Sequence, residues 1–228
     1  MISSDETNLD LKRTDRIGFG EAVFCTNKTP TQIDAILDLC REEGGDMLIT
    51  RLAPGKHIEL ADENKSKLDY DPVSETGFFQ FQRTTTLAAQ VAIVTAGTSD
   101  VSVAREAERT LAFNKIGATL IFDVGVAGLW RLTSRLEEIR AYPVIIAIAG
   151  MDAAMISILG GLVRSLLIAV PTSTGYGVAR NGETALAASL SSCAPGVVVC
   201  NIDNGYGAAC AAIRALQSIP FSPQIEKG

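Results

Sequence analysis

The strongest constraint on the fold is a series of five short apolar segments that starts at about residue 88 and alternates with stretches of helical spacing. Apolar residues follow one another within each segment without a break, which is typical of strands buried on both faces. When each strand is followed by a helix, the strands align in parallel and helices cover both faces of the sheet. The sequence therefore predicts an α/β protein with a three-layer α/β/α domain around a five-stranded parallel sheet. The five segments are "VAIVTAG", "ATLIFDVG", "PVIIAIAG", "SLLIAVPT" and "GVVVCNID".

The first 90 residues form a different kind of sequence. They carry 16 acidic and 10 basic residues, whereas residues 91–228 carry 10 of each. In "TPTQIDAILDLCREEGG" apolar residues recur at helical spacing, "DMLITRL" is typical of a strand, and "FFQFQRTTT" is either a strand or a connector. We expect a small α+β domain over residues 1–87, with its first ten residues flexible, and a second domain over residues 88–228.

Composition argues against several classes of function. The net charge of −6 does not favour sequence-independent nucleic-acid binding, which needs a basic surface. No apolar run approaches the ~18 residues of a membrane span, and the polar start "MISSDETNLDLKR" is unlike a signal peptide. Five cysteines, an odd number, agree with free thiols in a reducing compartment. We expect a cytoplasmic protein that binds neither nucleic acid nor membrane.

Small and polar residues follow all five predicted strands, where an open parallel sheet binds its ligands. After the first strand, "TAGTSD" offers backbone N–H groups at a helix start to an anion, or its Ser99 or Asp100 only caps that helix. "AGMDAAM" places Asp152 in the first turn of a helix, where the helix dipole favours an acid whatever the function. "PTSTGYGVARNGET" is either an ordinary loop or a substrate lid. No segment matches a Walker A loop or GxGxxG, so kinase and dinucleotide-dehydrogenase activities are not supported.

The only histidine, His57 in "APGKHIEL", lies in the first domain, and we interpret it as an exposed loop side chain. Without a histidine, residues 88–228 contain no Ser-His-Asp site, no Cys-His pair and no ordinary zinc site. Acid–base chemistry in that domain then depends on carboxylates, lysine, tyrosine or cysteine.

Three of the cysteines lie close together in the sequence, in "SLSSCAPGVVVCNIDNGYGAAC". Their spacing matches no zinc or iron–sulfur pattern. Cys200 lies in a predicted strand and Cys210 in the last helix, and both are expected to pack as small apolar residues. Cys193 follows a helix and precedes a Pro-Gly break, so its thiol is either part of the core or a group that projects into a cleft.

Taken together, the motifs resemble the LarB family, the pyridinium-3,5-biscarboxylic acid mononucleotide synthases of nickel-pincer cofactor assembly. The resemblance runs from about residue 8 to residue 217, and "NIDNGYGAA" with the upstream "SSCA" is its most specific part. The C-terminal domain of this family is in turn similar to the PurE-type aminoimidazole ribonucleotide carboxylases. That similarity implies a flavodoxin-like strand order and a homo-oligomer, an octamer or a tetramer of dimers. The matching motifs are "LDLKRTDRIGFGEAVFCTNKTPTQI", "VTAGTSDVSVAREA", "IFDVGVAGLWRL", "IAGMDAAM", "AVPTSTGYG" and "LSSCAPGVVVCNIDNGYGAA".

The resemblance implies a carboxylation followed by a hydrolysis. The substrates would be CO2 and nicotinic acid adenine dinucleotide, and a cysteine would add to the pyridinium ring so that a ring carbon becomes nucleophilic enough to attack CO2. Loss of the ring proton and of the thiolate restores the aromatic ring. Hydrolysis of the phosphoanhydride then releases AMP, with Mg²⁺ as the expected metal ion and no organic cofactor.

The matching positions make Cys193 the nucleophile and Asp152 the acid–base carboxylate, and they assign no metal ligand. "GTSD" and "PTSTGYG" would hold phosphate and ribose, and further polar candidates lie at the same edge of the sheet. The expected substrate-binding residues are Gly97, Thr98, Ser99, Asp100, Asp123, Gly150, Met151, Thr172, Ser173, Gly175, Tyr176, Gly177, Asn201, Asp203 and Asn204.

Two positions depart from the family pattern. Asp152 stands where the family has glutamate, and a displacement of ~1 Å in a reacting group can lower a rate ~100-fold. Trp130 stands where the family has histidine, and tryptophan can stack on a ring but cannot carry protons.

Two alternative functions and the identity of the dinucleotide stay open at this point. The first alternative is a PurE-like aminoimidazole ribonucleotide carboxylase or mutase, although its proton transfer needs a histidine. The second is a non-catalytic nucleotide-binding regulator, similar to circadian phase modifiers. The acid and the amide form of the dinucleotide are both compatible with the motifs.

Overall fold

A computed structural model describes residues 9–10, 12–83 and 87–218 of the chain, and it contains two sheets. The larger sheet has five strands in the order β6-β5-β7-β8-β9, and every neighbouring pair is parallel. The predicted α/β class, parallel sheet and flavodoxin-like order are therefore confirmed. The strands are β5 (Ala89–Thr95), β6 (Gly117–Ile121), β7 (Val144–Ala149), β8 (Leu166–Pro171) and β9 (Val198–Val199).

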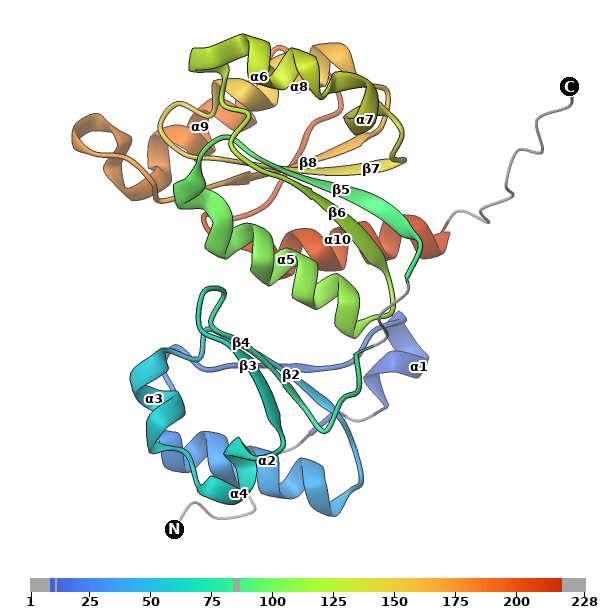
Figure 1. Cartoon of the computed structure of the whole chain (residues 1–228), viewed down its shortest axis with the longest axis vertical. Coiled ribbons are helices and arrows are strands. Elements are labelled where there is room, and N and C mark those ends of the chain that lie inside the picture. Colours follow the sequence, from blue (N-terminus) through green and yellow to red (C-terminus); the bar gives the residue numbers. More distant parts are fainter. Residues whose placement is uncertain (1–8, 11, 84–86, 219–228) are drawn as a thin grey trace, which may run out of the picture.

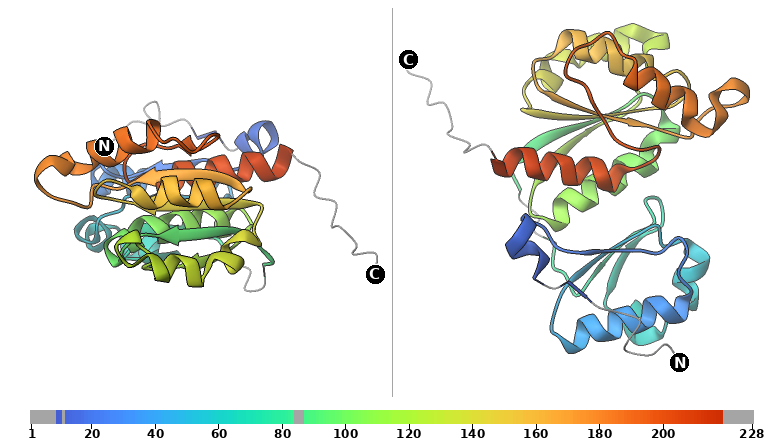
Figure 2. Two further views of the ribbon diagram at one scale, coloured as in Figure 1. Left: turned by 90° about the horizontal axis from the view of Figure 1, so that it is seen from above. Right: turned by 180° about the vertical axis from the view of Figure 1, so that it is seen from behind.

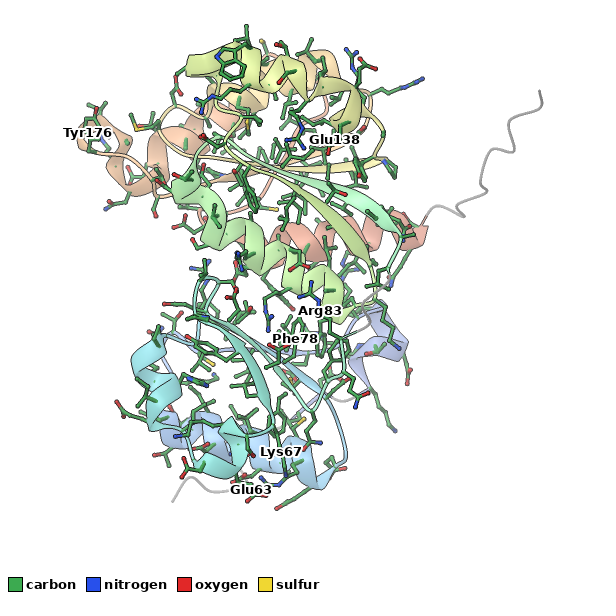
Figure 3. All side chains as sticks on the ribbon, in the orientation of Figure 1. Glu63, Lys67, Phe78, Arg83, Glu138 and Tyr176 are labelled. Carbon is green, nitrogen blue, oxygen red and sulfur yellow. The ribbon has the colours of Figure 1, made fainter. Side chains whose placement is uncertain are left out.

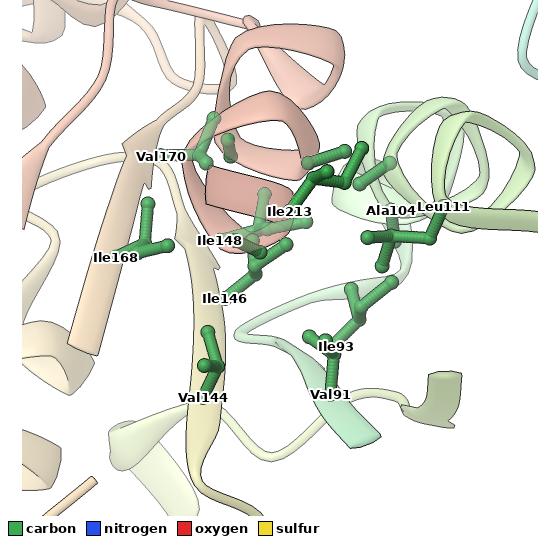
Figure 4. Packing of buried hydrophobic residues seen from close by; sticks show 14 of the residues in the cluster. Val91, Ile93, Ala104, Leu111, Val144, Ile146, Ile148, Ile168, Val170 and Ile213 are labelled. Atoms are coloured by element: carbon green, nitrogen blue, oxygen red, sulfur yellow. The ribbon is translucent and has the colours of Figure 1, made fainter. Parts of the chain in front are cut away.

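Helices cover both faces of this sheet (Figures 1 and 2). One face packs on α5 (Val101–Phe113) and α10 (Gly205–Ser218), where side chains such as Ile93, Ile146 and Leu111 form one core (Figure 4). The opposite face is covered by α6, α7, α8 and α9 and has its own core. Since every residue of β7 is buried, its unbroken apolar sequence is explained by burial on both faces. The four helices are α6 (Leu129–Ser134), α7 (Leu136–Arg140), α8 (Ala154–Leu162) and α9 (Glu183–Leu190).

The smaller sheet belongs to the N-terminal part of the chain and has the order β1-β2-β4-β3. The long helix α2 (Pro30–Glu42) packs on it through the predicted apolar positions, with Thr29 and Gln32 closing a capping box and proline at the first turn. The predicted α+β character of this part is confirmed. The remaining elements are β1 (Ala22–Phe24), β2 (Met47–Thr50), β3 (Leu68–Asp71), β4 (Thr76–Phe79), α1 (Arg13–Ile17), α3 (Pro54–Glu59) and α4 (Asp62–Lys65).

Helix α5 is also the surface on which the N-terminal sheet docks (Figure 1). The aromatic ring of Phe78 (labelled in Figure 3) is fully buried in this contact. The guanidinium of Arg109 lies 4.0 Å from the centroid of this ring. Phe81 and Phe113 complete the aromatic cluster. Four ion pairs flank it: Arg51–Glu106, Arg109–Asp69, Arg105–Asp71 and Arg83–Glu108. The two sheets are thus joined through both faces of one helix, α5.

Several details of the sequence-based prediction need correction. The region predicted as one helix after β6 is two helices, because the backbone of Arg135 leaves the helical conformation between α6 and α7. The fifth strand is only two residues long. His57 is not an exposed loop side chain: it lies in α3, half-buried, with its ring stacked on that of Tyr70 at 4.0 Å. The expected flexible start falls mostly outside the described residues.

Within the described ranges, no helix is both long enough and apolar enough to cross a bilayer.

The aromatic contact between the sheets predicts a large stability difference between two phenylalanines of the N-terminal sheet. Phe78→Ala should lower the free energy of unfolding by about 3–5 kcal/mol, because it leaves a cavity under Arg109. Phe24→Ala is the matched control, since Phe24 is 54% exposed, and it should cost less than about 1 kcal/mol. Urea denaturation of both variants measures the difference. Equal losses would show that Phe78 is not the anchor of this contact.

Candidate active site

A cavity of about 320 Å³ opens at the carboxyl edge of the large sheet, between the ends of β5 and β7. These strands lie side by side, but the chain leaves β5 toward β6 and returns to form β7 on the other side. The loops that follow the two strands consequently turn in opposite directions and leave a crevice, the usual ligand position in such sheets. We call it the switch-point cavity. Its walls come from the segments after β5, β6 and β7 and from Thr174 after β8.

The segment after β7 approaches its neighbours so closely that only glycine fits at position 150. A Cβ on Gly150 would lie 2.5 Å from the Thr174 carbonyl oxygen and 2.7 Å from the Thr172 hydroxyl. The next turn is held in left-handed backbone conformations at Met151 (φ 56°) and Ala153 (φ 52°). Such strain in residues with side chains is typical of functional sites.

The strained turn holds Asp152 at the cavity. The prediction that Asp152 lies in the first turn of a helix is wrong, because α8 starts at Ala154 and Ala153 is its N-cap residue. The carboxylate instead accepts a hydrogen bond from the Ala154 N–H at 3.3 Å, and its side chain is exposed on the cavity wall. An exposed carboxylate in this position is free to exchange a proton with a bound ligand.

Asp100 is the second carboxylate of the cavity wall, and it is only 2% exposed. It accepts hydrogen bonds from the Thr172 hydroxyl at 2.7 Å and from the Gly97 N–H at 2.9 Å. Burial nevertheless raises the pKa of Asp100 above its ordinary value, and the charge of nearby Asp203 acts in the same direction. A carboxyl with a raised pKa beside a cavity is a candidate for proton transfer.

Asp123 is the third carboxylate, and its side chain pairs with Arg131 at 2.8 Å. Both residues line the cavity. The backbone of Asp123 is left-handed (φ 56°), and its N–H donates to the Thr95 hydroxyl at 3.1 Å. Sequence reasoning did not select Arg131, although it lies inside the matching motif "IFDVGVAGLWRL".

A second cavity, of about 240 Å³, lies between the N-terminal sheet and the same carboxyl edge; we call it the interdomain cavity. Four expected binding residues, Ser99, Thr172, Ser173 and Asp203, line it. The Asp203 carboxylate accepts a hydrogen bond from the Ser173 N–H at 2.8 Å, which fixes the loops after β8 and β9 to each other. Ser99 lines both cavities.

Cys193 is the exposed member of the five cysteines. Cys25, Cys40 and Cys210 are buried or half-buried, and burial raises their thiol pKa values to about 12, 11 and 11. Cys193 lies two residues beyond the C-cap of α9, whose chain runs away from the carboxyl edge, and Ser192 beside it hydrogen-bonds to Ser157 of α8 at 2.8 Å. In the described part of the chain, Cys193 lines neither cavity. One copy of the chain therefore does not bring Cys193 and Asp152 together in one cavity.

The other expected binding residues also lie outside the two cavities. Tyr176 is 82% exposed on the turn that projects from the body of the domain (Figure 3). The Asn204 side chain accepts a hydrogen bond from the Gly207 N–H near the start of α10. The Asn201 side chain accepts a hydrogen bond from the Ile202 N–H. The residues of this group are Thr98, Gly175, Tyr176, Gly177, Asn201 and Asn204.

Among the described residues, no three histidine, cysteine, aspartate or glutamate side chains cluster closely enough to hold a metal ion. Asp123 is engaged by Arg131, and Asp100 is enclosed by hydrogen bonds. The residues present do not fit a resident metal cage. Mg²⁺ often binds through substrate phosphates with its own waters, so a metal that accompanies a phosphate ligand needs no such cage.

Comparison with known proteins gives matches over both parts of the chain. The family model described as LarB/PurE-like N-terminal domain matches residues 3–82, and the model described as AIR carboxylase matches residues 90–224. The uncharacterised protein MJ0165 of Methanocaldococcus jannaschii is 36% identical over 219 residues, which cover 90% of this chain and 81% of that protein.

The raised pKa of Asp100 predicts a pH-dependent stability. The folded protein holds the Asp100 proton more tightly than the unfolded chain does, so stability falls as pH rises from the ordinary value of 3.8 toward the raised value. Asp100→Asn removes this titration, and the stability of the wild type relative to the variant should therefore decrease over the range from about pH 4 upward. Urea denaturation across that range tests it. Parallel pH profiles for the two proteins would contradict a raised pKa at Asp100.

Proposed function

The chain belongs to the LarB family and carries a carboxylase-type domain of the AIR carboxylase family, and from this premise we propose that it carboxylates the pyridinium ring of nicotinic acid adenine dinucleotide. Hydrolysis of the phosphoanhydride then releases AMP and a carboxylated mononucleotide. The observation that carries the proposal is the switch-point cavity, where three carboxylates, Asp100, Asp123 and Asp152, and a single arginine line the wall. A wall of this charge suits the cationic ring.

In the proposed carboxylation, bonds form and break in the following order. The thiolate of Cys193 adds to a ring carbon, and the electron pair displaced from the ring removes the positive charge. A neighbouring ring carbon then forms a bond to CO2. A carboxylate takes the proton from that carbon, the electron pair returns to the ring, and the C–S bond breaks. The thiolate is regenerated, and the ring is again aromatic and carries two carboxylates.

Asp152 supports this chemistry as the proton acceptor, because it is the exposed carboxylate of the cavity. The left-handed turn around it offers a physical reason why aspartate can replace the longer glutamate of the family. Its backbone departs from a regular helix start, so the position of the carboxylate depends on the turn as well as on side-chain length.

The position of Cys193 supports a site shared between copies of the chain. Two exposed apolar side chains, Leu190 and Val198, lie near Cys193 in the sequence. Exposed Trp130 lies in α6, and exposed Met151 lies in the cavity-lining loop after β7. Exposed apolar residues commonly mark association surfaces where they form a contiguous patch, and soluble oligomers are most often formed from copies of one chain. We propose that the cysteine of one copy completes the switch-point cavity of another in a homo-oligomer.

The alternative functions are less well supported. A PurE-like reaction on an aminoimidazole ribonucleotide needs a histidine, but His57 is stacked on Tyr70 in the N-terminal part and lines neither cavity. The separation of Cys193 from Asp152 in one copy is the observation that favours a non-catalytic nucleotide-binding regulator.

A turnover assay separates these functions. The protein is mixed with nicotinic acid adenine dinucleotide, bicarbonate and Mg²⁺, and mass spectrometry follows AMP and the carboxylated mononucleotide. Cys193→Ala should lower product formation at least ~1,000-fold, since it removes the nucleophile. Cys210→Ala is the matched control: it removes a half-buried thiol whose pKa is raised by burial, and should retain activity. Binding without turnover by the wild type would favour the regulator.

Complementation tests the shared site. Cys193→Ala and Asp152→Asn are each expected to be inactive, but they damage different halves of a site formed by two copies. Co-expressed with different tags and purified through both, the mixed oligomers should recover about a quarter of wild-type activity, because random assembly leaves that share of sites intact. No recovery in mixed oligomers would show that both residues act within one copy.

A further inference from the structure

We propose that the interdomain cavity binds the ribose of the adenylate half of the dinucleotide, so that the N-terminal domain recognises the part of the substrate that leaves as AMP. This inference rests on the proposed function for the identity of the whole ligand. Its own basis is the position, size and chemistry of the cavity between Arg51, Ser74 and Glu75 of the N-terminal domain and the carboxyl edge of the large sheet.

The two cavities are neighbours along the edge of the sheet. Ser99 and Thr174 belong to the walls of both, so a ligand in the switch-point cavity has only these two residues to pass before it enters the interdomain cavity. The volumes are about 320 and 240 Å³. The first lies just above and the second below the lower limit of the ~300–1,000 Å³ typical of sites that enclose a complete ligand. Each cavity therefore fits one half of a ligand that has two halves.

The charge of the interdomain cavity argues against a phosphate as its occupant. Glu75, Glu106 and Asp203 line it, together with Arg51. The positive charge of Arg51 is compensated within the protein, because its guanidinium lies 3.1 Å from the Glu106 carboxylate. The guanidinium also donates a hydrogen bond to the Asp203 carbonyl oxygen. Glu106 is 3% exposed and accepts a hydrogen bond from the Tyr206 N–H, so this pair is a fixed part of the wall.

The chemistry of the wall instead suits a neutral group with several hydroxyls. Carboxylates accept hydrogen bonds from the hydroxyls of a ribose, as they do in other nucleotide sites. Serine and threonine hydroxyls can both donate and accept, and Ser99, Ser102 and Ser173 contribute them here. Val73 and Val103 add apolar surface for the carbon side of the sugar. A ribose combines these features.

The N-terminal domain contributes to this cavity through two segments that the docking on α5 holds in place. The turn between β3 and β4 carries Ser74 and Glu75 toward the start of α5 (Figure 1). Arg51 directly follows β2, and the Leu52 N–H donates to the Glu75 carbonyl oxygen at 2.9 Å, which ties the two segments together. The cavity exists only because the two domains are in contact.

The test measures the binding of AMP alone by isothermal titration calorimetry, with no carboxylation required. Ser102→Leu fills the cavity from the exposed first turn of α5 and should weaken AMP binding at least about tenfold, because the sugar is displaced. Ser66→Leu, an exposed serine of the N-terminal domain outside the cavity, is the matched control and should bind AMP like the wild type. The wild type should bind 2′,3′-dideoxy-AMP about tenfold more weakly than AMP, because both ribose hydroxyls are missing.

The outcomes separate this inference from the proposed function. Equal AMP affinity in the wild type and Ser102→Leu, or no AMP binding in a wild type that turns over the dinucleotide, would overturn the ribose site and leave the carboxylation intact. Ribose-dependent AMP binding that Ser102→Leu abolishes, in a protein without turnover, would support the site and contradict the carboxylation.

Discussion

The burial of a parallel sheet on both faces is the constraint on which the site depends. Helices α5 and α10 cover one face and α6 to α9 the other, so the side chains in the body of the sheet are mostly apolar. Polar groups can reach a ligand only at the ends of the strands, where the backbone leaves the sheet. Between β5 and β7 the order in which the chain adds strands to the sheet reverses, which opens the edge at one point. Asp100, Asp123 and Asp152 line the cavity there, although Asp152 follows Asp100 by 52 positions in the sequence.

Helix α5 connects the two halves of the molecule because it is buried on one side by the large sheet and contacted on the other by the small one. Its two sides make different kinds of contact. Leu111 packs into the sheet core, whereas Glu106 and Arg109 meet charged groups of the N-terminal domain. Glu106 lines the interdomain cavity as well, so the contact that joins the domains also shapes a second pocket beside the first.

The chemistry of the candidate site reflects the residue types available to it. The large domain contains no histidine, and the three carboxylates of the switch-point cavity lie in three different environments. Asp152 is exposed, Asp123 is paired with Arg131, and Asp100 is buried with a raised pKa. The cysteines also differ in environment. Burial raises the thiol pKa of Cys25, Cys40 and Cys210, whereas Cys193 is exposed. The three aspartates of the cavity thus differ in exposure and in the groups that contact them.

The sequence by itself determined the α/β class, the parallel sheet, the helices that follow its strands and the edge where polar residues gather, because these follow from local patterns of apolar and polar residues. Only the tertiary structure decided which of these residues meet. Asp152 precedes its helix because the backbone turns left-handed at Met151 and Ala153. The spacing of apolar residues does not predict this conformation. Arg51 reaches the edge through the docking of one domain on another, and Cys193 lies apart from Asp152 because α9 carries the chain away from the edge. Such placements depend on contacts between residues distant in the sequence, which local patterns do not contain.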